Sequence, residues 1–239
     1  MRKRDVTVGR SVKFTDHALA VSASVSCMDI GHLSDAIDKV NRSDVAFWHY
    51  DVVDGVFNQC LILGDLLYPY LKEKSRLPIE IHLAVEQPER YIDIFSRYKL
   101  DYIAVHAETM NEPERVFRRI RECGALPVLA YRAETPPGED FVDLAKECAW
   151  VLKLTVNPGF SGQKIQDAAV RHIREMSDRL IHAGIGCRIQ ADGNVNEKTV
   201  HTLYEAGARI FTGGSSGLFT EERSIQENVV RLIQSAQCS

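Results

Sequence analysis

The chain has 239 residues, a length that fits one α/β barrel or two small domains. Its formal net charge of −4 and its 45% hydrophobic content are ordinary for a globular protein and give no basic surface for nucleic acid or an anionic membrane. No apolar run approaches the roughly 20 residues that span a bilayer, and no such run follows the basic N-terminus to form a signal peptide. We therefore expect no nucleic-acid partner and no membrane partner.

The cysteines point to a reducing compartment. Six of them are scattered at positions 27, 60, 123, 148, 187 and 238, and no two form a C-x-x-C pair. Disulfide frameworks belong mainly to short secreted chains, so we interpret these residues as free thiols. A cytoplasmic location is the expectation.

Apolar runs rich in β-branched residues alternate with segments of helical periodicity along the chain. Strands are predicted at 18–25, 45–52, 79–83, 102–106, 126–131, 151–156, 188–191 and 209–212. A helix is predicted after each of them in turn, at 31–41, 65–74, 89–98, 112–123, 138–148, 167–183, 196–206 and 224–236. No break in this pattern marks a second domain, so we divide the chain into an N-terminal extension, 1–17, and one domain, 18–239.

Strict alternation of strands and helices predicts a parallel sheet, because each helix must carry the chain back to the start of the next strand. Eight such units favour an α/β fold closed as a single (β/α)8 TIM barrel, and an open doubly wound sheet is the alternative. In a closed barrel the chemistry lies at the C-terminal ends of the strands. The residues that end the predicted strands are therefore the candidate site.

Two histidines and two aspartates end three of the predicted strands. His49 and Asp51 lie two residues apart on the second strand and so share a face, while His82 ends the third strand and Asp192 the seventh. One such residue alone is usually structural, but four together favour a site. Imidazole and carboxylate ligands suit a single divalent Zn, Fe, Mn or Co ion. His106, which ends the fourth strand, is either a fifth member or a buried residue behind the ligands.

Two glycine-rich segments follow the sixth and eighth strands. Glycine lets backbone N–H groups approach an anion closely, and loops at this end of (β/α)8 barrels often cradle a phosphate. No motif for a nicotinamide, flavin or pyridoxal group is needed, so we expect no organic cofactor. The two segments are Asn157-Pro158-Gly159-Phe160-Ser161-Gly162-Gln163 and Thr212-Gly213-Gly214-Ser215-Ser216-Gly217.

These residues stand in motifs that resemble the ribulose-phosphate 3-epimerase family, including its allulose-6-phosphate 3-epimerase branch. The resemblance runs from about residue 18 to the C-terminus, and the segment at 157–163 is highly specific to the family. The other matching segments are Ser24-Val25-Ser26-Cys27-Met28-Asp29, His49-Tyr50-Asp51-Val52-Val53-Asp54-Gly55, Ile81-His82-Leu83, Val105-His106-Ala107-Glu108 and Ala191-Asp192-Gly193.

The resemblance implies a barrel of the ribulose-phosphate-binding type, a homo-oligomer and a phosphorylated ketose as substrate. It implies that Asp51 and Asp192 are the two acid/base carboxylates that epimerise C3 through an enediolate. It also implies that His49, Asp51, His82 and Asp192 hold the metal ion. Substrate contacts are implied for Ser24 and His82, and the phosphate is expected on Gly159, Phe160, Ser161, Gly162, Gly193, Gly214, Ser215 and Ser216.

The sequence departs from the family pattern around the reacting carbons. The family usually has methionine where Val53, Ala84 and Leu154 stand, and a second glycine where Asn194 stands. Smaller side chains at 53 and 84 would leave room for a bulkier sugar. The substrate is therefore expected to be either D-ribulose 5-phosphate or a ketohexose 6-phosphate such as D-allulose 6-phosphate.

Two other functions are open from the residues. A Schiff-base aldolase would use Lys153, the one lysine inside a predicted strand, although parity with Leu154 turns Lys153 toward the helices with its ammonium group reaching solvent. A non-catalytic sugar-phosphate-binding barrel is the second alternative, which the altered substrate-facing residues favour. It would not require the four metal and acid/base positions to be kept.

Overall fold

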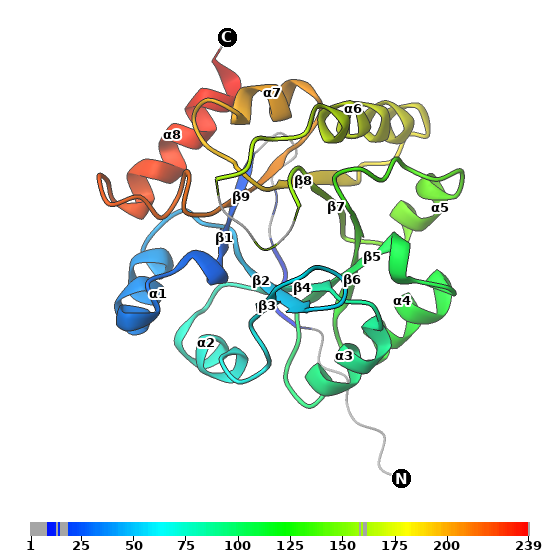
Figure 1. Cartoon of the computed structure of the whole chain (residues 1–239), viewed down its shortest axis with the longest axis horizontal. Coiled ribbons are helices and arrows are strands. Elements are labelled where there is room, and N and C mark those ends of the chain that lie inside the picture. The colour runs from blue at the N-terminus through cyan, green and yellow to red at the C-terminus, as the bar shows by residue number, and fades with distance from the viewer. Residues whose placement is uncertain (1–8, 13, 15–18, 158, 160–161, 239) are drawn as a thin grey trace.

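The structure, a computed structural model, describes residues 9–12, 14, 19–157, 159 and 162–238. Within these ranges eight parallel strands close into a barrel, because β1 pairs with both β2 and β9 (Figure 1). The predicted (β/α)8 TIM barrel is confirmed, and the open sheet is excluded because no edge is left between the first and last strands. The strands are β1 (Ala20–Ser24), β2 (Phe47–Asp54), β4 (Ile79–Ala84), β5 (Tyr102–His106), β6 (Leu126–Tyr131), β7 (Trp150–Leu154), β8 (Arg188–Asp192) and β9 (Ile210–Gly213).

Helices surround the barrel on the outside (Figure 1). None of those in the described part of the chain is long and apolar enough to cross a membrane. Each packs an apolar stripe on the strands, as α4 does with Val116, Phe117 and Ile120. The helices are α1 (Leu33–Asn41), α2 (Tyr68–Lys74), α3 (Pro88–Phe95), α4 (Pro113–Glu122), α5 (Phe141–Lys146), α6 (Asp167–His182), α7 (Val200–Glu205) and α8 (Ile225–Gln237).

The segment between β2 and α2 differs from the prediction. A helix was expected over 65–74, but α2 begins only at Tyr68, with Pro69 in its first turn, where a missing N–H is harmless. Before it, the short strand β3 (Leu61–Ile62) pairs antiparallel with the end of β2. Alternation over two residues is too short a signal to read from sequence. The hairpin matters because it lies at the mouth of the barrel.

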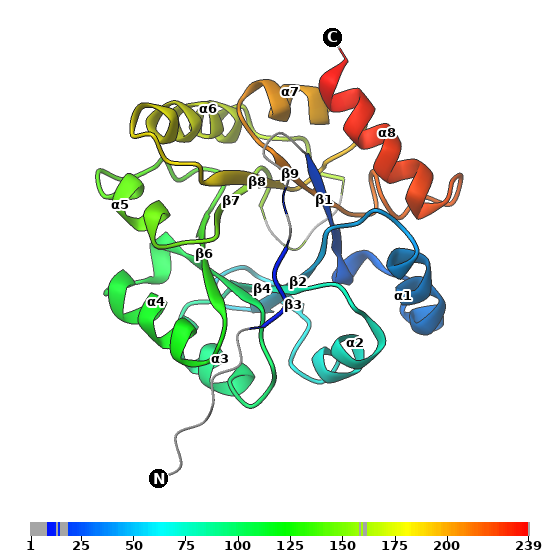
Figure 2. The same cartoon turned by 180° about the vertical axis from the view of Figure 1, so that it is seen from behind.

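Aromatic side chains fill the N-terminal end of the barrel interior. The ring of Trp150 lies 5.0 Å from that of Phe47 and 4.4 Å from that of Tyr102. The described residues of the N-terminal extension, 9–12 and 14, cross this end from outside, as Figure 2 shows. Phe14 meets Trp150 edge-on at 5.9 Å, and the N–H of Val12 donates to the Tyr102 hydroxyl at 2.8 Å. The barrel interior is therefore packed at this end, and a cavity lies toward the C-terminal ends of the strands.

Candidate active site

Strand parity brings the two histidines and two aspartates together inside the barrel mouth. Asp51 pairs in register with His82 on the neighbouring strand, and one ligand atom from each of the four residues lies within 4.8 Å of the others. The Nε2 atom of His49 lies 2.9 Å from Asp51 Oδ1 and 3.3 Å from Asp192 Oδ2. The Nδ1 atom of His82 lies 3.0 Å from the same Asp51 oxygen. The spacing read from the sequence thus corresponds to one compact N/O cluster.

A buried polar network lies directly beneath His49. The Nδ1–H of His49 donates to Glu80 Oε2 at 2.6 Å, and Glu80 also accepts from Trp150 Nε1 and from Gln190 Nε2, each at 2.9 Å. Glu80 is fully buried, so these donors replace the water that its carboxylate would otherwise need. Glu80 and Gln190 were not among the predicted site residues, although each lies two residues before a predicted ligand and so shares its face.

A second series of side-chain contacts lies behind His82. Its Nε2 atom is 2.8 Å from His106 Nε2, and His106 Nδ1 is 3.2 Å from Glu108 Oε2. Burial lowers the pKa of His106 to about 4, so this imidazole is neutral near pH 7. Burial would raise the pKa of Glu108, but the interactions with His106, together with hydrogen bonds from Thr135 and the Arg132 backbone, outweigh it and lower this pKa to about 2. His106 therefore supports His82 from behind and is not one of the four clustered ligands.

These contacts fix which imidazole nitrogens face the cluster. Glu80 accepts a hydrogen bond from the Nδ1–H of His49, so in neutral His49 the Nε2 lone pair faces two carboxylates. In His82 the proton on Nε2 points to His106, and the Nδ1 lone pair faces Asp51. Lone pairs cannot face carboxylate oxygens at about 3 Å unless positive charge lies between them. Either protons on both rings or one divalent cation supplies that charge, and the N/O donor set with its outer partners fits such a cation.

The pKa shifts of His49 and Asp51 also favour a cation at the cluster. Burial would lower the pKa of His49, but the carboxylates of Asp51, Asp192 and Glu80 outweigh it and raise this pKa well above 6.5. Burial would raise the pKa of Asp51, but His49 and His82 hold it well below 3.8. The cluster thus keeps Asp51 ionised and attracts positive charge to the nitrogen atoms, as a cation site must.

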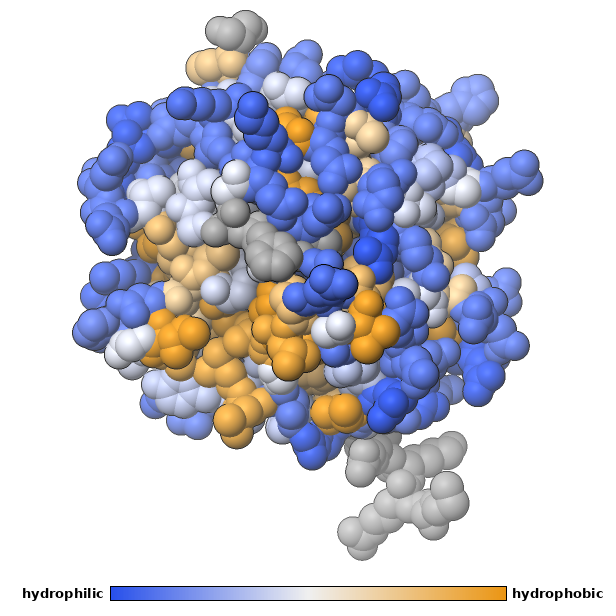
Figure 3. Space-filling model, viewed as in Figure 1, coloured by the Kyte–Doolittle hydropathy of each residue, from blue (hydrophilic) through white to orange (hydrophobic). Residues whose placement is uncertain are grey.

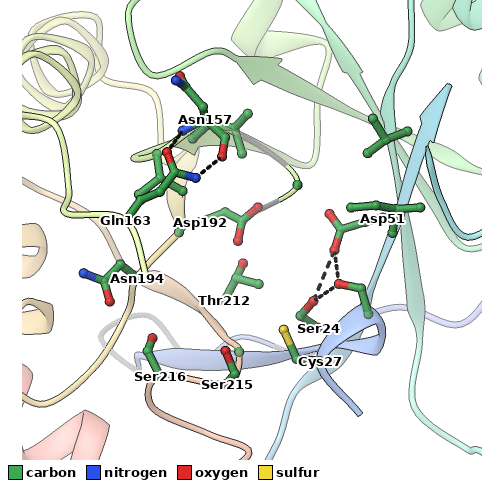
Figure 4. Close-up of a pocket in the computed structure, with 18 of the residues that line it drawn as sticks. Ser24, Cys27, Asp51, Asn157, Gln163, Asp192, Asn194, Thr212, Ser215 and Ser216 are labelled. Atoms are coloured by element: carbon green, nitrogen blue, oxygen red, sulfur yellow. Dashed lines mark hydrogen bonds between the residues drawn. The ribbon is translucent and has the colours of Figure 1, made fainter. Parts of the chain in front are cut away.

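A cavity of about 620 Å³ opens above the cluster (Figure 4). Asp51 and Asp192 lie across it from one another with their carboxylates turned toward its interior, as Figure 4 shows. The hydroxyls of Ser24 and Ser26 each donate to Asp51 Oδ2 at 3.1 Å. Ser24 was predicted to contact the substrate, whereas Ser26 was quoted only as part of a motif. The two carboxylates therefore face one space with different hydrogen-bond partners.

The predicted phosphate loops line the same cavity opposite Asp51. Figure 4 shows Ser215 and Ser216 side by side with Asn194 above them. Phe160 and Ser161, also predicted to bind phosphate, lie outside the described residues. Besides Asp51 and Asp192, the predicted residues that the structure places in the lining are Ser24, Gly159, Gly162, Gly193, Gly214, Ser215 and Ser216. His82, for which a substrate contact was also implied, is not among the lining residues.

Two of these glycines are required by the backbone. Gly193 has φ of +118°, and a Cβ there would lie 2.5 Å from Val156 Cγ2. Gly159 has φ of +100°, and its Cβ would lie 2.2 Å from Cys60 Sγ. Both conformations are open to glycine at no steric cost, which lets the two loops approach the cavity closely.

Small side chains occupy two of the three positions where the family pattern has methionine, Val53 and Ala84. Val53 lines the cavity, and Val53 and Ala84 form a small apolar cluster with Phe57, against which Ile62 also packs. The hairpin formed by β2 and β3 thus supplies apolar surface to the cavity. This contribution could not be predicted from the strand pattern, because it depends on the hairpin.

Lys153 lies outside the lining of this cavity. Its side chain is fully buried, and its ammonium group donates to the backbone carbonyls of Arg132 and Thr135. The expectation that the ammonium reaches solvent was wrong, because the β6–α5 loop covers it. Lys153 is not among the residues that line the cavity, so a Schiff-base lysine is not positioned to meet a substrate there.

Burial lowers the pKa of Lys153 to about 8, from 10.5 in the unfolded chain. Between these values the unfolded chain binds more protons, so stability should rise with pH, by about 3 kcal/mol from pH 8 to 10.5. Urea unfolding at pH 8, 9 and 10 should show this rise in the wild type relative to Lys153→Met. Parallel curves for the two proteins would contradict the assignment.

Comparison with known proteins agrees with the family resemblance of the sequence motifs. A profile of the ribulose-phosphate 3 epimerase family matches residues 20–219. The chain is 33% identical over 198 residues to the ribulose-phosphate 3-epimerase of Methanocaldococcus jannaschii, with 83% of each protein covered. It is 30% identical over 212 residues to the ribulose-phosphate 3-epimerase of Bacillus subtilis, with 87% of this chain and 97% of that protein covered.

Similar solved structures include two other (β/α)8 barrels. The tryptophan synthase α-subunit of Pyrococcus furiosus superposes with a TM-score of 0.62 at 12% identity, covering 94% of this chain and 99% of that one. Phosphoribosyl anthranilate isomerase from Thermococcus kodakaraensis has a TM-score of 0.62 at 12% identity, covering 93% and 100%. At such low identity these two likenesses establish the fold alone.

Proposed function

Because the chain belongs to the ribulose-phosphate 3-epimerase family and is an isomerase that acts on carbohydrates, we propose that it epimerises C3 of a phosphorylated ketose with the help of one divalent metal ion. The observation that carries the proposal is the convergence of two imidazoles and two carboxylates beside glycine-rich loops in one cavity. A site that only bound a sugar phosphate would not need two carboxylates on different sides of the ligand.

We propose that Asp51 and Asp192 exchange one proton each with C3. They come from β2 and β8, which are separated around the barrel by β1 and β9, so their carboxylates approach the cavity from different directions. One carboxylate removes the proton from one face, and the other returns a proton to the opposite face, which inverts the centre. The hydroxyls of Ser24 and Ser26 hold Asp51 in place for this transfer.

The proton at C3 is weakly acidic, so negative charge that develops on O2 and O3 must be stabilised. His49, Asp51, His82 and Asp192 would hold a Zn, Fe, Mn or Co ion, and that ion would act as a Lewis acid toward the two oxygens. Glu80 and His106 keep the two imidazoles in the tautomers that ligation requires. No organic cofactor is part of this proposal.

The phosphate group would lie on the loops that follow β7, β8 and β9. Their backbone N–H groups and the hydroxyls of Ser215 and Ser216 are suited to a dianion, and the glycines allow close approach. Binding energy at this remote end orients C2 and C3 against the carboxylates. We propose D-ribulose 5-phosphate or a ketohexose 6-phosphate such as D-allulose 6-phosphate, the second being supported by the small Val53 and Ala84 side chains.

The test is proton exchange at C3. The metal-loaded protein is incubated in D2O with each ketose phosphate, and deuterium at C3 is followed by NMR. Exchange together with epimer formation is expected with one of the two sugars, and weaker activity with the other. Two substrates that differ by one carbon are discriminated by only ~1–3 kcal/mol in the free energy of the transition state. An absence of exchange with every phosphorylated ketose would favour the sugar-phosphate-binding alternative.

We also propose that the protein forms a homo-oligomer through the apolar surface beside the barrel mouth. Figure 3 shows hydrophobic side chains gathered on the lower part of this face, where Figure 1 places β3 and α2. Leu66 is 91% exposed and Leu61 is 81% exposed, and Val56 and Ile30 are also exposed. Contiguous exposed apolar surface of this kind is typical of a protein–protein interface. We propose that a second copy of the chain covers it.

Light scattering at micromolar concentration tests this assembly. The wild type should have at least twice the mass of one chain, and the double variant Val56→Asp/Leu66→Asp should shift toward the monomer. Ile181→Asp is the matched control, because Ile181 is 73% exposed on α6, outside this surface. A wild-type protein with the mass of one chain would rule the assembly out.

The structure is compatible with the cytoplasmic location that we propose. All six cysteines lie within the described ranges, and each is a free thiol. Free thiols persist in reducing compartments.

A further inference from the structure

The loop between β2 and β3 is connected to the metal-site histidines by direct contacts. The centre of the Phe57 ring in this loop lies 4.5 Å from that of the His106 imidazole. Phe57 is only 4% exposed, although it lies in a loop at the mouth. His106 contacts His82 on its other side, so only one side chain separates the loop from a predicted metal ligand.

Arg132 holds Phe57 from outside. The centre of its guanidinium group lies 3.5 Å from the centre of the Phe57 ring, and its Nη2 donates to the Phe57 carbonyl at 2.7 Å. One side chain thus contacts both the ring and the backbone of the same residue. The backbone N–H of Arg132 donates to Glu108 Oε1 at 2.7 Å, and the other oxygen of Glu108 pairs with His106. Arg132 therefore touches both residues that hold His106.

We propose that Phe57 and Arg132 are positioning residues for the metal site, which hold His106 and through it the orientation of His82. The hydrogen bonds of His106 act along its two ring nitrogens and do not by themselves fix the tilt of the ring, against which the His82 ring packs at 5.1 Å. The Phe57 ring restrains the tilt from one face, and Arg132 keeps Phe57 in contact. With His106 fixed, the Nε2 proton of His82 keeps its acceptor, and Nδ1 stays turned toward Asp51. Partners outside the ligand shell set metal affinity in this way.

The start of the same loop is also held. The Asp54 carboxylate accepts from the backbone N–H groups of Val56 at 2.9 Å and Phe57 at 2.8 Å, and from that of Glu86 at 2.9 Å. The position of the Phe57 backbone is thus set by the end of β2, and Arg132 adds the contact to its ring. Removing the Arg132 contact should loosen the ring without unfolding the loop.

The inference rests on the proposed metal site but not on the sugar chemistry, so the test uses Co²⁺ alone. The dissociation constant and the visible spectrum of the Co²⁺-loaded protein are measured for wild type, Phe57→Leu, Arg132→Met and the double variant. Each single variant should weaken Co²⁺ binding about tenfold, the lower end of the effect of outer-shell partners, and should shift the spectrum. Arg115→Met is the control, since Arg115 lies exposed on α4 and pairs with Glu112.

Because Phe57 and Arg132 act through one contact, the double variant should bind Co²⁺ no more weakly than the weaker single variant. A dissociation constant within twofold of wild type in both single variants would overturn the inference, even if thermal unfolding shows that they are destabilised. Effects that multiply in the double variant would also overturn it. Wild-type protein that binds Co²⁺ but exchanges no ketose proton would refute the proposed reaction and leave this comparison valid.

Discussion

Replacing either Asp51 or Asp192 with asparagine should lower the rate of epimerisation by about 10²- to 10⁴-fold, the range expected when one general acid or base is lost. Asparagine keeps the shape of the side chain and removes its ability to carry a proton. Epimerisation needs a proton carrier on each face of C3, so each variant lacks one of the two carriers and epimerises far more slowly. Turnover is measured with the sugar that the wild type accepts, and metal content is measured in the same samples because both residues are predicted ligands.

The two variants should differ in a way that assigns the faces. A variant that keeps one carboxylate can still remove a proton from the epimer whose C3–H faces that carboxylate, and the proton returns to the same face. In D2O each variant should therefore exchange C3–H of one epimer, without inversion, and the two variants should prefer opposite epimers. Asp38→Asn, on the exposed side of α1, is the control. A variant of Asp51 or Asp192 that epimerises at more than a tenth of the wild-type rate would contradict the two-carboxylate mechanism.

The barrel and its strand ends could be predicted from sequence because each depends on local periodicity. Residues two apart on a strand must share a face, so His49 and Asp51 could be paired before any fold was known. Strict alternation of strands and helices then allowed only parallel strands, and their C-terminal ends had to meet at one mouth. The four predicted ligands on three strands could therefore be identified from sequence patterns that are only a few residues long.

The surroundings of the cluster could not be predicted in this way, because they depend on contacts between distant parts of the chain. Glu80 and Trp150 are 70 residues apart and meet only when the barrel closes. Arg132 reaches Phe57 across 75 residues of chain, through a hairpin whose second strand is only two residues long. Lys153 was correctly expected inside a strand, yet the loop that covers its ammonium group belongs to another βα unit. Residue type and spacing carry no signal for such partners.

The contrast between residues on strands and residues in the hairpin bears on the proposed choice of substrate. The proposed catalytic and metal-binding residues lie on strands, where the alternation of side chains fixes the direction in which each one points. The cavity lining includes Val53 on a strand but also Ile62 and Leu63 from the β3 segment. If the proposed sugars bind there, discrimination between five and six carbons should depend partly on the hairpin. Sequence motifs on the strands alone are insufficient to name the sugar.

His82→Ala should remove the bound metal. Wild-type protein purified without a chelator should contain about one Zn, Fe, Mn or Co ion per chain, held by four N/O ligands. The variant loses one ligand, removes one of the two imidazole contacts of Asp51 Oδ1, and leaves His106 Nε2 without its contact to His82. Since the loss of an outer-shell partner alone costs 10- to 100-fold in affinity, loss of a ligand together with its contacts should weaken binding by more than about 100-fold.

Metal content by elemental analysis and Co²⁺ titration decide the outcome, and epimerase activity should fall in parallel with occupancy. His32→Ala is the matched control, because His32 is exposed and pairs only with Asp29 among the ion pairs of the described residues. That variant should keep the metal and the activity of the wild type. A His82→Ala protein that still holds about one metal ion per chain would place the metal elsewhere, and wild-type protein without stoichiometric metal would refute the site itself. If His82→Ala loses both metal and proton exchange while its thermal unfolding stays cooperative, the four residues act together as one metal site, with His82 as a ligand and not merely a buried polar side chain.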